Sequence, residues 1–110
     1  MKENDTPQNT DKHELIPPID TVFGSPIRLA IMLILLGSKK VGFTELQKLL
    51  KITPGKLGHH INKLETKNYV HITKTFLLMR PHTVIKLTAD GEASFRDYIR
   101  KLRTILNKIE

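Results

Sequence analysis

Apolar residues recur along the chain in short segments, and their spacing predicts helices in some segments and strands in others. From Pro26 to Leu36 nearly every residue is apolar, and Ser25-Pro26 is a helix-start signal because serine caps and proline suits a first turn. We expect a helix there that Gly37 ends and that needs cover on most sides. Residues 39–43 predict a very short strand.

Two further short helices are expected in the next segment. Thr44 and Gln47 have the spacing of a capping box, which predicts a helix from Thr44 to about Lys51. Thr53-Pro54 repeats the cap-and-proline signal, and the following helix has an apolar stripe at i, i+4 and i+7. That stripe consists of Leu57, Ile61 and Leu64. Two such helices joined by a tight turn predict a helix-turn-helix over residues 44–67.

Alternation with a period of two marks the segment after these helices. Val70 and Ile72 share one face of a first β-rich run, and Ile85 and Leu87 share one face of a second. Between them, Pro81 disfavours continued pairing. A hairpin over residues 70–87 behind a helix-turn-helix is a winged helix arrangement, with the hairpin as the wing. Arg80 and His82 are then placed to reach a minor groove or flanking phosphates.

One long helix is predicted at the end of the chain, from Ala89 to Ile109, with Thr88 as its cap. Its apolar positions are four and three residues apart, which is the seam of a coiled coil. We expect this seam and the apolar helix that begins at Pro26 to pack on a second copy; packing within one chain is the alternative. The predicted interface residues are Leu29, Leu33, Phe95, Ile99, Leu102, Leu106 and Ile109.

The two parts of the chain that flank these elements complete the predicted organisation. Residues 1–14 contain no branched aliphatic or aromatic residue, which predicts a disordered tail before a single domain over residues 15–110. Residues 15–23 predict a short helical turn or an extended arm on that domain. The fold class is therefore mainly α with a small β-hairpin (α+β). The longest apolar run, Leu29–Leu36, is far below the ~20 residues of a membrane span.

Charge adds a functional indication to this architecture. The net charge of the chain is +7. The segment from Lys39 to Lys86 contains ten basic residues and two acidic ones, so its net charge is +8. A basic block inside a folded domain is typical of a protein that binds a polyanion. The outer face of the helix after Pro54 holds basic and hydrogen-bonding residues, which suits the major groove of DNA. A solvated amphipathic helix is the alternative for this element taken alone.

Other chemistry is not indicated. The chain has no cysteine, and the side chains of His59 and His60 diverge by about 100° on a helix, so they do not chelate one metal together. His60 is expected to pack and to make one hydrogen bond, and Arg28 to form a structural ion pair or a phosphate contact. Without a nucleophile–base arrangement or a glycine-rich phosphate loop, we expect no enzyme, no metal site and no cofactor. A cytoplasmic, nucleoid-associated location fits the absence of a signal peptide.

The order of five short motifs carries a family resemblance. They are S-P-I-R-L-A-I (Ser25–Ile31), F-T-E-L (Phe43–Leu46), G-K-L-G-H-H-I-N-K-L (Gly55–Leu64), N-Y-V (Asn68–Val70) and R-P-H-T-V-I-K-L-T-A-D-G (Arg80–Gly91). From about Pro18 to Leu106 the chain resembles MarR/ArsR-type winged helix-turn-helix transcriptional regulators, in particular small single-domain archaeal forms. The resemblance implies a dimer that binds operator DNA through helix 54–67 and the wing. The residues predicted to contact DNA are Thr44, Gly55, Lys56, His59, Asn62, Lys63, Lys67, Arg80 and His82.

Three functions follow from these observations. The leading hypothesis is a homodimeric transcriptional regulator that reads double-stranded DNA, with a small-molecule effector allowed but not indicated. The second is a nucleoid-type protein with little sequence preference. The glycines of helix 54–67 favour it, because they fit weaker reading of the bases. The third is a winged-helix module for protein interaction, which the apolar segment Leu77–Met79 favours.

Overall fold

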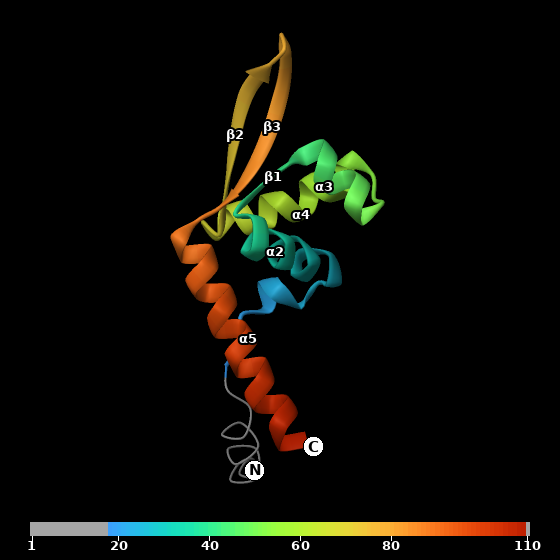
Figure 1. Ribbon diagram of the computed structural model, residues 1–110. Coiled ribbons are helices and arrows are strands. Elements are labelled where there is room, and N and C mark those ends of the chain that lie inside the picture. The colour runs from blue at the N-terminus through green and yellow to red at the C-terminus, as the bar shows by residue number, and fades with distance from the viewer. Residues whose placement is uncertain (1–17, 110) are drawn as a thin grey trace, which may run out of the picture.

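The computed structural model describes residues 18–109, which form four α-helices, one 3₁₀ turn and a three-stranded antiparallel sheet (Figure 1). The predicted fold class, mainly α with a small sheet in winged helix order, is confirmed. The predicted tail and the first residues of the predicted arm lie outside the described residues. No helix in the described part of the chain is both long and apolar enough to cross a membrane. In order, the elements are η2 (Thr21–Gly24), α2 (Pro26–Ser38), β1 (Lys40–Gly42), α3 (Phe43–Leu50), α4 (Pro54–Thr66), β2 (Val70–Leu77), β3 (Arg80–Leu87) and α5 (Ala89–Ile109).

The start of α2 agrees with the prediction, and its end does not. The Ser25 Oγ accepts a hydrogen bond from the Arg28 N–H at 3.3 Å, as expected of a cap. The helix continues through Gly37 to Ser38, so the prediction that Gly37 ends it is wrong. Lys39 closes the helix instead, with a φ of 72° and an N–H that donates to the Leu35 carbonyl at 2.8 Å.

Helix α3 begins one residue earlier than predicted, at Phe43. The Gly42 N–H donates to the Glu45 Oε1 at 3.4 Å, so the contact that reaches back over the helix start belongs to Glu45. The predicted capping box of Thr44 and Gln47 is therefore wrong, and Thr44 lies exposed in the first turn. Lys51 ends α3 in the left-handed conformation, with a φ of 56°.

Helix α4 follows the prediction closely. The Thr53 Oγ1 accepts a hydrogen bond from the Lys56 N–H at 3.2 Å, and Pro54 occupies the first turn. The predicted stripe of Leu57, Ile61 and Leu64 is buried. Burial of this stripe leaves the opposite face of α4 open to solvent.

The sheet brings distant parts of the chain together. Its strand order is β1-β3-β2, and Lys40 in β1 pairs with Lys86 in β3. Strands β2 and β3 remain paired to the end of the hairpin, where Leu77 lies opposite Arg80. The prediction that Pro81 interrupts pairing is wrong, since Pro81 lies opposite Phe76. Strand β1 pairs only with residues 84–86 of β3, so Pro81 stands at a free edge, where a proline is tolerated.

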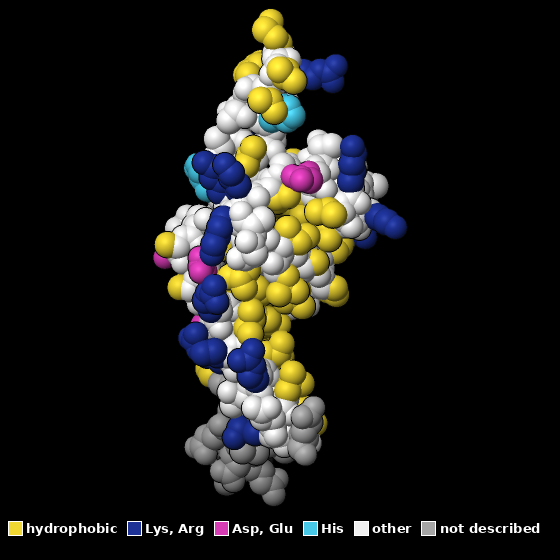
Figure 2. Space-filling model, viewed as in Figure 1, with side chains coloured by type: hydrophobic (Ala, Val, Ile, Leu, Met, Phe, Trp, Pro, Cys, Tyr) yellow, Lys and Arg dark blue, Asp and Glu magenta, His cyan; other side chains and the backbone are white. Residues whose placement is uncertain are grey.

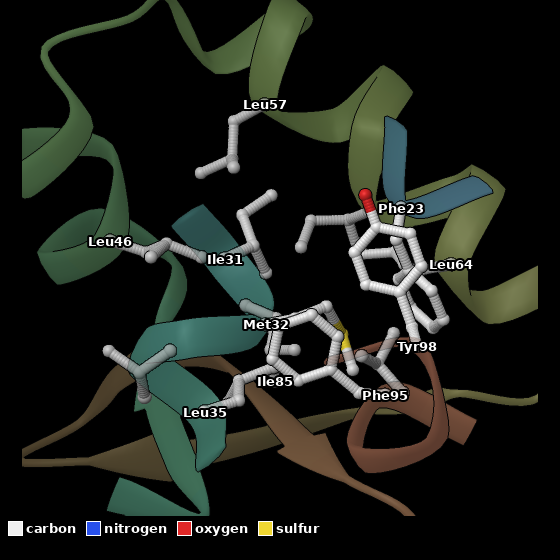
Figure 3. Packing of buried hydrophobic residues seen from close by; sticks show 13 residues of the cluster. Phe23, Ile31, Met32, Leu35, Leu46, Leu57, Leu64, Ile85, Phe95 and Tyr98 are labelled. Carbon is white, nitrogen blue, oxygen red and sulfur yellow. The ribbon is translucent and has the colours of Figure 1, made fainter. Parts of the chain in front are cut away.

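A single hydrophobic core joins η2 to all four helices and the sheet. Figure 3 shows Leu46 of α3 and Leu57 of α4 pointing toward Ile31 of α2. The rings of Phe23 and Phe95 meet edge to face, with centroids 5.2 Å apart. Phe95 is fully buried within one chain, which corrects the prediction that it contributes to a subunit interface. Phe95 lies on the a/d seam but packs on Phe23 of η2 in the same chain. Helical periodicity alone does not show which of the two surfaces a seam residue contacts.

Helix α5 packs on the core from its first turn to Leu102 and leaves the core after it. Its buried residues are Gly91, Phe95 and Tyr98, whereas Leu106 and Ile109 are exposed. Figure 1 shows the second half of α5 extending away from the other helices. The hairpin and the end of α5 thus extend from the core in opposite directions.

Candidate nucleic-acid interface

The outer face of α4 gathers most of the residues that the sequence predicts for DNA. Gly55, Lys56, His59, Asn62 and Lys63 are all exposed, and Glu65 is the only acidic residue within the helix. Cationic and amide side chains of this kind contact phosphates and base edges. The buried stripe orients them together, away from the core.

His60 lies beside this face but has a structural role. Its Nδ1 lies 2.9 Å from the Arg28 Nη1, and the Arg28 Nε donates to the Val22 carbonyl at 2.7 Å. Because the guanidinium is always a donor, the Nδ1 must accept, so this contact requires a neutral ring. Burial, and next the charge of Arg28, lower the pKa of His60 below its usual value. The expected packing and single hydrogen bond are thus observed, and Arg28 links α2, η2 and α4.

A groove between α4 and the hairpin adds a basic residue that the sequence reasoning missed. Gly58 and Asn62 line one side of this groove, and Lys74 and Thr83 line the other. Lys74 follows Ile72 by two residues, so strand alternation places both on the face of the sheet that looks toward α4. That alternation was the signal that could have identified Lys74.

A second recess lies between the start of α3 and the edge of β3. It brings together Thr44, Arg80 and His82, which the sequence predicted from separate segments. Lys48 also lines this recess and was not predicted, and Glu45 contributes one carboxylate to it. The helix-turn-helix and the wing therefore share one polar surface.

Lys67 lies beside Asp20, the residue that caps η2. It follows the last turn of α4, and its Nζ is 4.0 Å from the Asp20 Oδ1. The hydroxyl of Tyr69 donates to the other carboxylate oxygen of Asp20. Burial raises the pKa of Tyr69, and its hydrogen bond to Asp20 adds to this increase. Lys67 was predicted to contact DNA, and its ion pair with Asp20 is a structural role that competes with that prediction.

An exposed apolar surface lies away from these polar groups. Leu33 is 53% exposed, Leu106 is 49% exposed and Ile109 is 75% exposed. Figure 2 shows hydrophobic side chains in a continuous area over the region of α2 and down toward α5. Leu29, Ile99 and Leu102 are partly buried and pack at the edge of the core. Six of the seven residues predicted for a subunit interface therefore retain some exposed surface.

Metal-ligating side chains do not gather in the part of the chain that the structure covers. No group of three or more His, Cys, Asp or Glu residues there is arranged to hold a metal ion. His59 and His60 have ring centroids 5.3 Å apart, and the Nδ1 of His60 is occupied by Arg28.

Comparisons with known proteins agree with this geometry. The family model of the winged helix DNA-binding domain matches residues 27–106. An uncharacterized protein of Methanocaldococcus jannaschii is 34% identical over 89 residues, which cover 81% of this chain and 97% of that protein. The structure of a transcriptional regulator homologue from Pyrococcus horikoshii is 31% identical, with a TM-score of 0.79 over 92% of this chain and 98% of that chain. A mutant of MarR from Escherichia coli shares the fold, with a TM-score of 0.66 over 91% of this chain and 74% of that chain at 18% identity.

Proposed function

The chain belongs to the family of winged helix DNA-binding domains, and from this premise we propose that it is a homodimeric transcriptional regulator. In this proposal α4 enters the major groove, and the hairpin of β2 and β3 lies on the adjacent minor groove and its phosphates. The solved structure at 31% identity is of a transcriptional regulator homologue, which supports the regulatory role. A location with the DNA in the cytoplasm follows from this function.

The outer face of α4 is the observation that carries the proposal. Lys56 and Lys63 supply charge for phosphates, while His59 and Asn62 supply donors and acceptors for base edges. The hairpin adds Lys74 across the groove and Arg80 in the recess by α3. Together these residues form one surface made by α3, α4 and the hairpin, as duplex binding requires.

The exposed apolar surface supports the dimer. Leu33, Leu106 and Ile109 expose about half or more of their area, and a soluble domain rarely leaves such a patch uncovered. A second copy packed on α2 and the free half of α5 would cover it. Two α4 helices would then contact major grooves about one turn, ~34 Å, apart, so the preferred site would be a palindrome.

Selection of bound duplexes from a random pool tests sequence reading. We expect an enriched palindrome whose affinity exceeds that of random duplex by ~10³ or more at physiological salt. His59→Ala and Asn62→Ala should relax the preference at particular base pairs. A pool that returns no common sequence, with retained binding, would favour the nucleoid-type alternative, in which Gly55 and Gly58 leave fewer side chains to read bases.

Salt dependence tests the phosphate contacts. Lys63→Ala should weaken binding to all duplexes alike and lower the slope of log affinity against log salt by about one. Lys108→Ala is the matched control, because it removes the same side chain from the last turn of α5. Lys67→Ala should have a smaller effect than Lys63→Ala, since Asp20 already lies beside Lys67. Equal losses for Lys63→Ala and Lys108→Ala would contradict the assignment of α4.

A further inference from the structure

The hairpin ends in four consecutive apolar side chains that extend into solvent. Phe76 is 77% exposed, Leu77 59%, Leu78 87% and Met79 93%. Figure 2 shows this tip as a hydrophobic cluster far from the core, with one basic side chain and one histidine next to it. Water opposes such exposure, and a contiguous apolar cluster at a projecting end indicates that something covers it in the working state.

The backbone of the tip is also unfavourable for its residues. Leu78 and Met79 form the two-residue turn between Leu77 and Arg80, and their φ angles are 52° and 66°. A two-residue hairpin turn with both φ values positive prefers Asn-Gly, because a Cβ crowds the following carbonyl oxygen there; glycine has no Cβ, and the short polar side chain of asparagine compensates with a local hydrogen bond. The hairpin itself would be more stable with those residues. Neither solvation nor backbone conformation therefore explains leucine and methionine at this turn.

The charge around the tip matches nucleic acid. The hairpin from Val70 to Leu87 contains no acidic residue, and its basic residues are Lys74, Arg80 and Lys86. Arg80 lies directly opposite Leu77, so its guanidinium leaves the strand beside the apolar cluster. Apolar side chains that enter between base pairs, with cations on the flanking phosphates, are a known way to bind and kink duplex DNA.

The reach of the hairpin is suited to the groove next to α4. Ile72 and Ile85, which pair in the sheet, are the last residues of the hairpin that pack on the core. Five residues separate Ile72 from Leu77, a span of roughly 17 Å at ~3.3 Å per residue. Half a turn of the duplex, from a major groove to the adjacent minor groove, is also about 17 Å.

We propose that Leu78 and Met79 form an apolar wedge that enters the minor groove beside the α4 contact and partly unstacks one base step. The duplex then bends toward its major groove, and Arg80 holds the flanking phosphate. This inference rests on the proposed function, since it requires that α4 is bound to the same duplex. In this proposal the tip unstacks and bends the duplex, whereas the polar surface of α4 contacts base edges and phosphates.

The test compares full-length protein with the double variant Leu78→Asn/Met79→Gly. This variant removes the wedge and places the preferred Asn-Gly pair in the turn, so the hairpin stays formed. The probes are 30-base-pair duplexes from the selected pool, with a dye pair at the ends and 2-aminopurine placed in turn at each base step of the minor groove beside the α4 contact. We expect the parent protein to raise 2-aminopurine fluorescence and shorten the end-to-end distance. The variant should do neither and should bind roughly tenfold more weakly.

The outcomes separate the wedge from the function on which it rests. Lys63→Ala should weaken binding while the remaining complex still unstacks the step. If Lys63→Ala weakens binding but the turn variant binds and bends DNA as the parent does, the wedge is overturned and the function stands. Binding of no duplex by the parent overturns both. Turn-dependent sedimentation with phosphatidylglycerol vesicles, or turn-dependent capture of one partner protein, without any effect on DNA would also overturn the wedge.

Discussion

A single methyl group at Gly91 tests how tightly α5 is held against the base of the hairpin. Alanine at this position would place its Cβ 2.1 Å from the carbonyl oxygen of Tyr69 and 2.8 Å from the carbonyl carbon. Ordinary contacts are roughly 3.5 Å, so α5 or Tyr69 must move by more than about 1 Å. Tyr69 resists such a movement because its ring stacks on Phe23, with centroids 5.2 Å apart, and its carbonyl accepts from the Thr88 N–H at 3.2 Å.

The expected loss of stability follows from two opposing contributions. Forcing additional volume into a packed region lowers the free energy of unfolding by about 1–3 kcal/mol. Replacing a helical glycine by alanine returns at most about 1 kcal/mol. Because the Cβ would overlap backbone atoms, the upper part of the first range applies, and we expect Gly91→Ala to lose about 1–2 kcal/mol. In a domain of this size the melting temperature should fall by roughly 5–15 °C.

Thermal and urea denaturation, followed by far-ultraviolet circular dichroism, measure this change. Gly58→Ala is the matched control, because a Cβ added in the middle of α4 meets nothing within 4 Å. That variant should gain up to about 1 kcal/mol from helix propensity alone. The reasoning is refuted if Gly91→Ala melts at or above the temperature of the parent, or if both variants shift in the same direction.

Three further predictions concern pH, assembly and local capping. His60 has a lowered pKa in the folded state, so its contribution to stability is complete above its unfolded pKa of 6.5 and decreases as the pH falls below that value. His60→Gln should flatten the stability profile between pH 7 and pH 5; equal profiles for the parent and this variant would exclude His60 as the source. Leu106→Glu/Ile109→Glu should convert a dimer to monomers in analytical ultracentrifugation, whereas Thr104→Glu, on the opposite face of α5, should not; a dimer in both variants would place the interface elsewhere. Thr53→Ala removes the cap of α4 and should cost about 1 kcal/mol in urea denaturation, while Thr44→Ala should be close to neutral because Thr44 caps nothing; a large loss for Thr44→Ala would restore the capping box predicted for it.

The parts of the fold predicted from sequence are those that depend on local periodicity. The stripe of Leu57, Ile61 and Leu64 and the alternation of the hairpin both require only a neighbouring apolar surface, whatever its source. The ends of α2 and α3 were harder, because Lys39 and Lys51 adopt positive φ values that sequence signals assign to glycine. The chain has to turn at Lys39 because β1 begins at the next residue, and at Lys51 because α4 begins shortly after it. Contacts distant in sequence therefore set these two helix ends.

The candidate site shows the same division. The exposed face of α4 follows from its buried stripe, so Lys56, His59, Asn62 and Lys63 were predictable. Lys74 was missed because only strand register shows that it faces α4 across a groove. Phe95 was placed at an interface because helical spacing does not distinguish a partner subunit from η2 of the same chain. The predicted DNA contacts and the predicted dimer both await the experiments above.

The pairing of β1 with β3 also defines how this domain is connected. The ladder from Lys40↔Lys86 to Gly42↔Val84 closes one long loop of the chain. That loop contains every residue predicted to contact DNA, while α2 and α5, with the exposed apolar surface, lie outside it. Closing a loop of this length costs about 3 kcal/mol of chain entropy beyond a constant contribution. We therefore expect the hairpin to form early and the ladder to form late in folding, and we expect a fragment limited to the helix-turn-helix to remain unfolded. The three residue pairs of the ladder thus close the loop that holds the residues predicted to contact DNA, beside the hydrophobic core that this loop shares with α2 and α5.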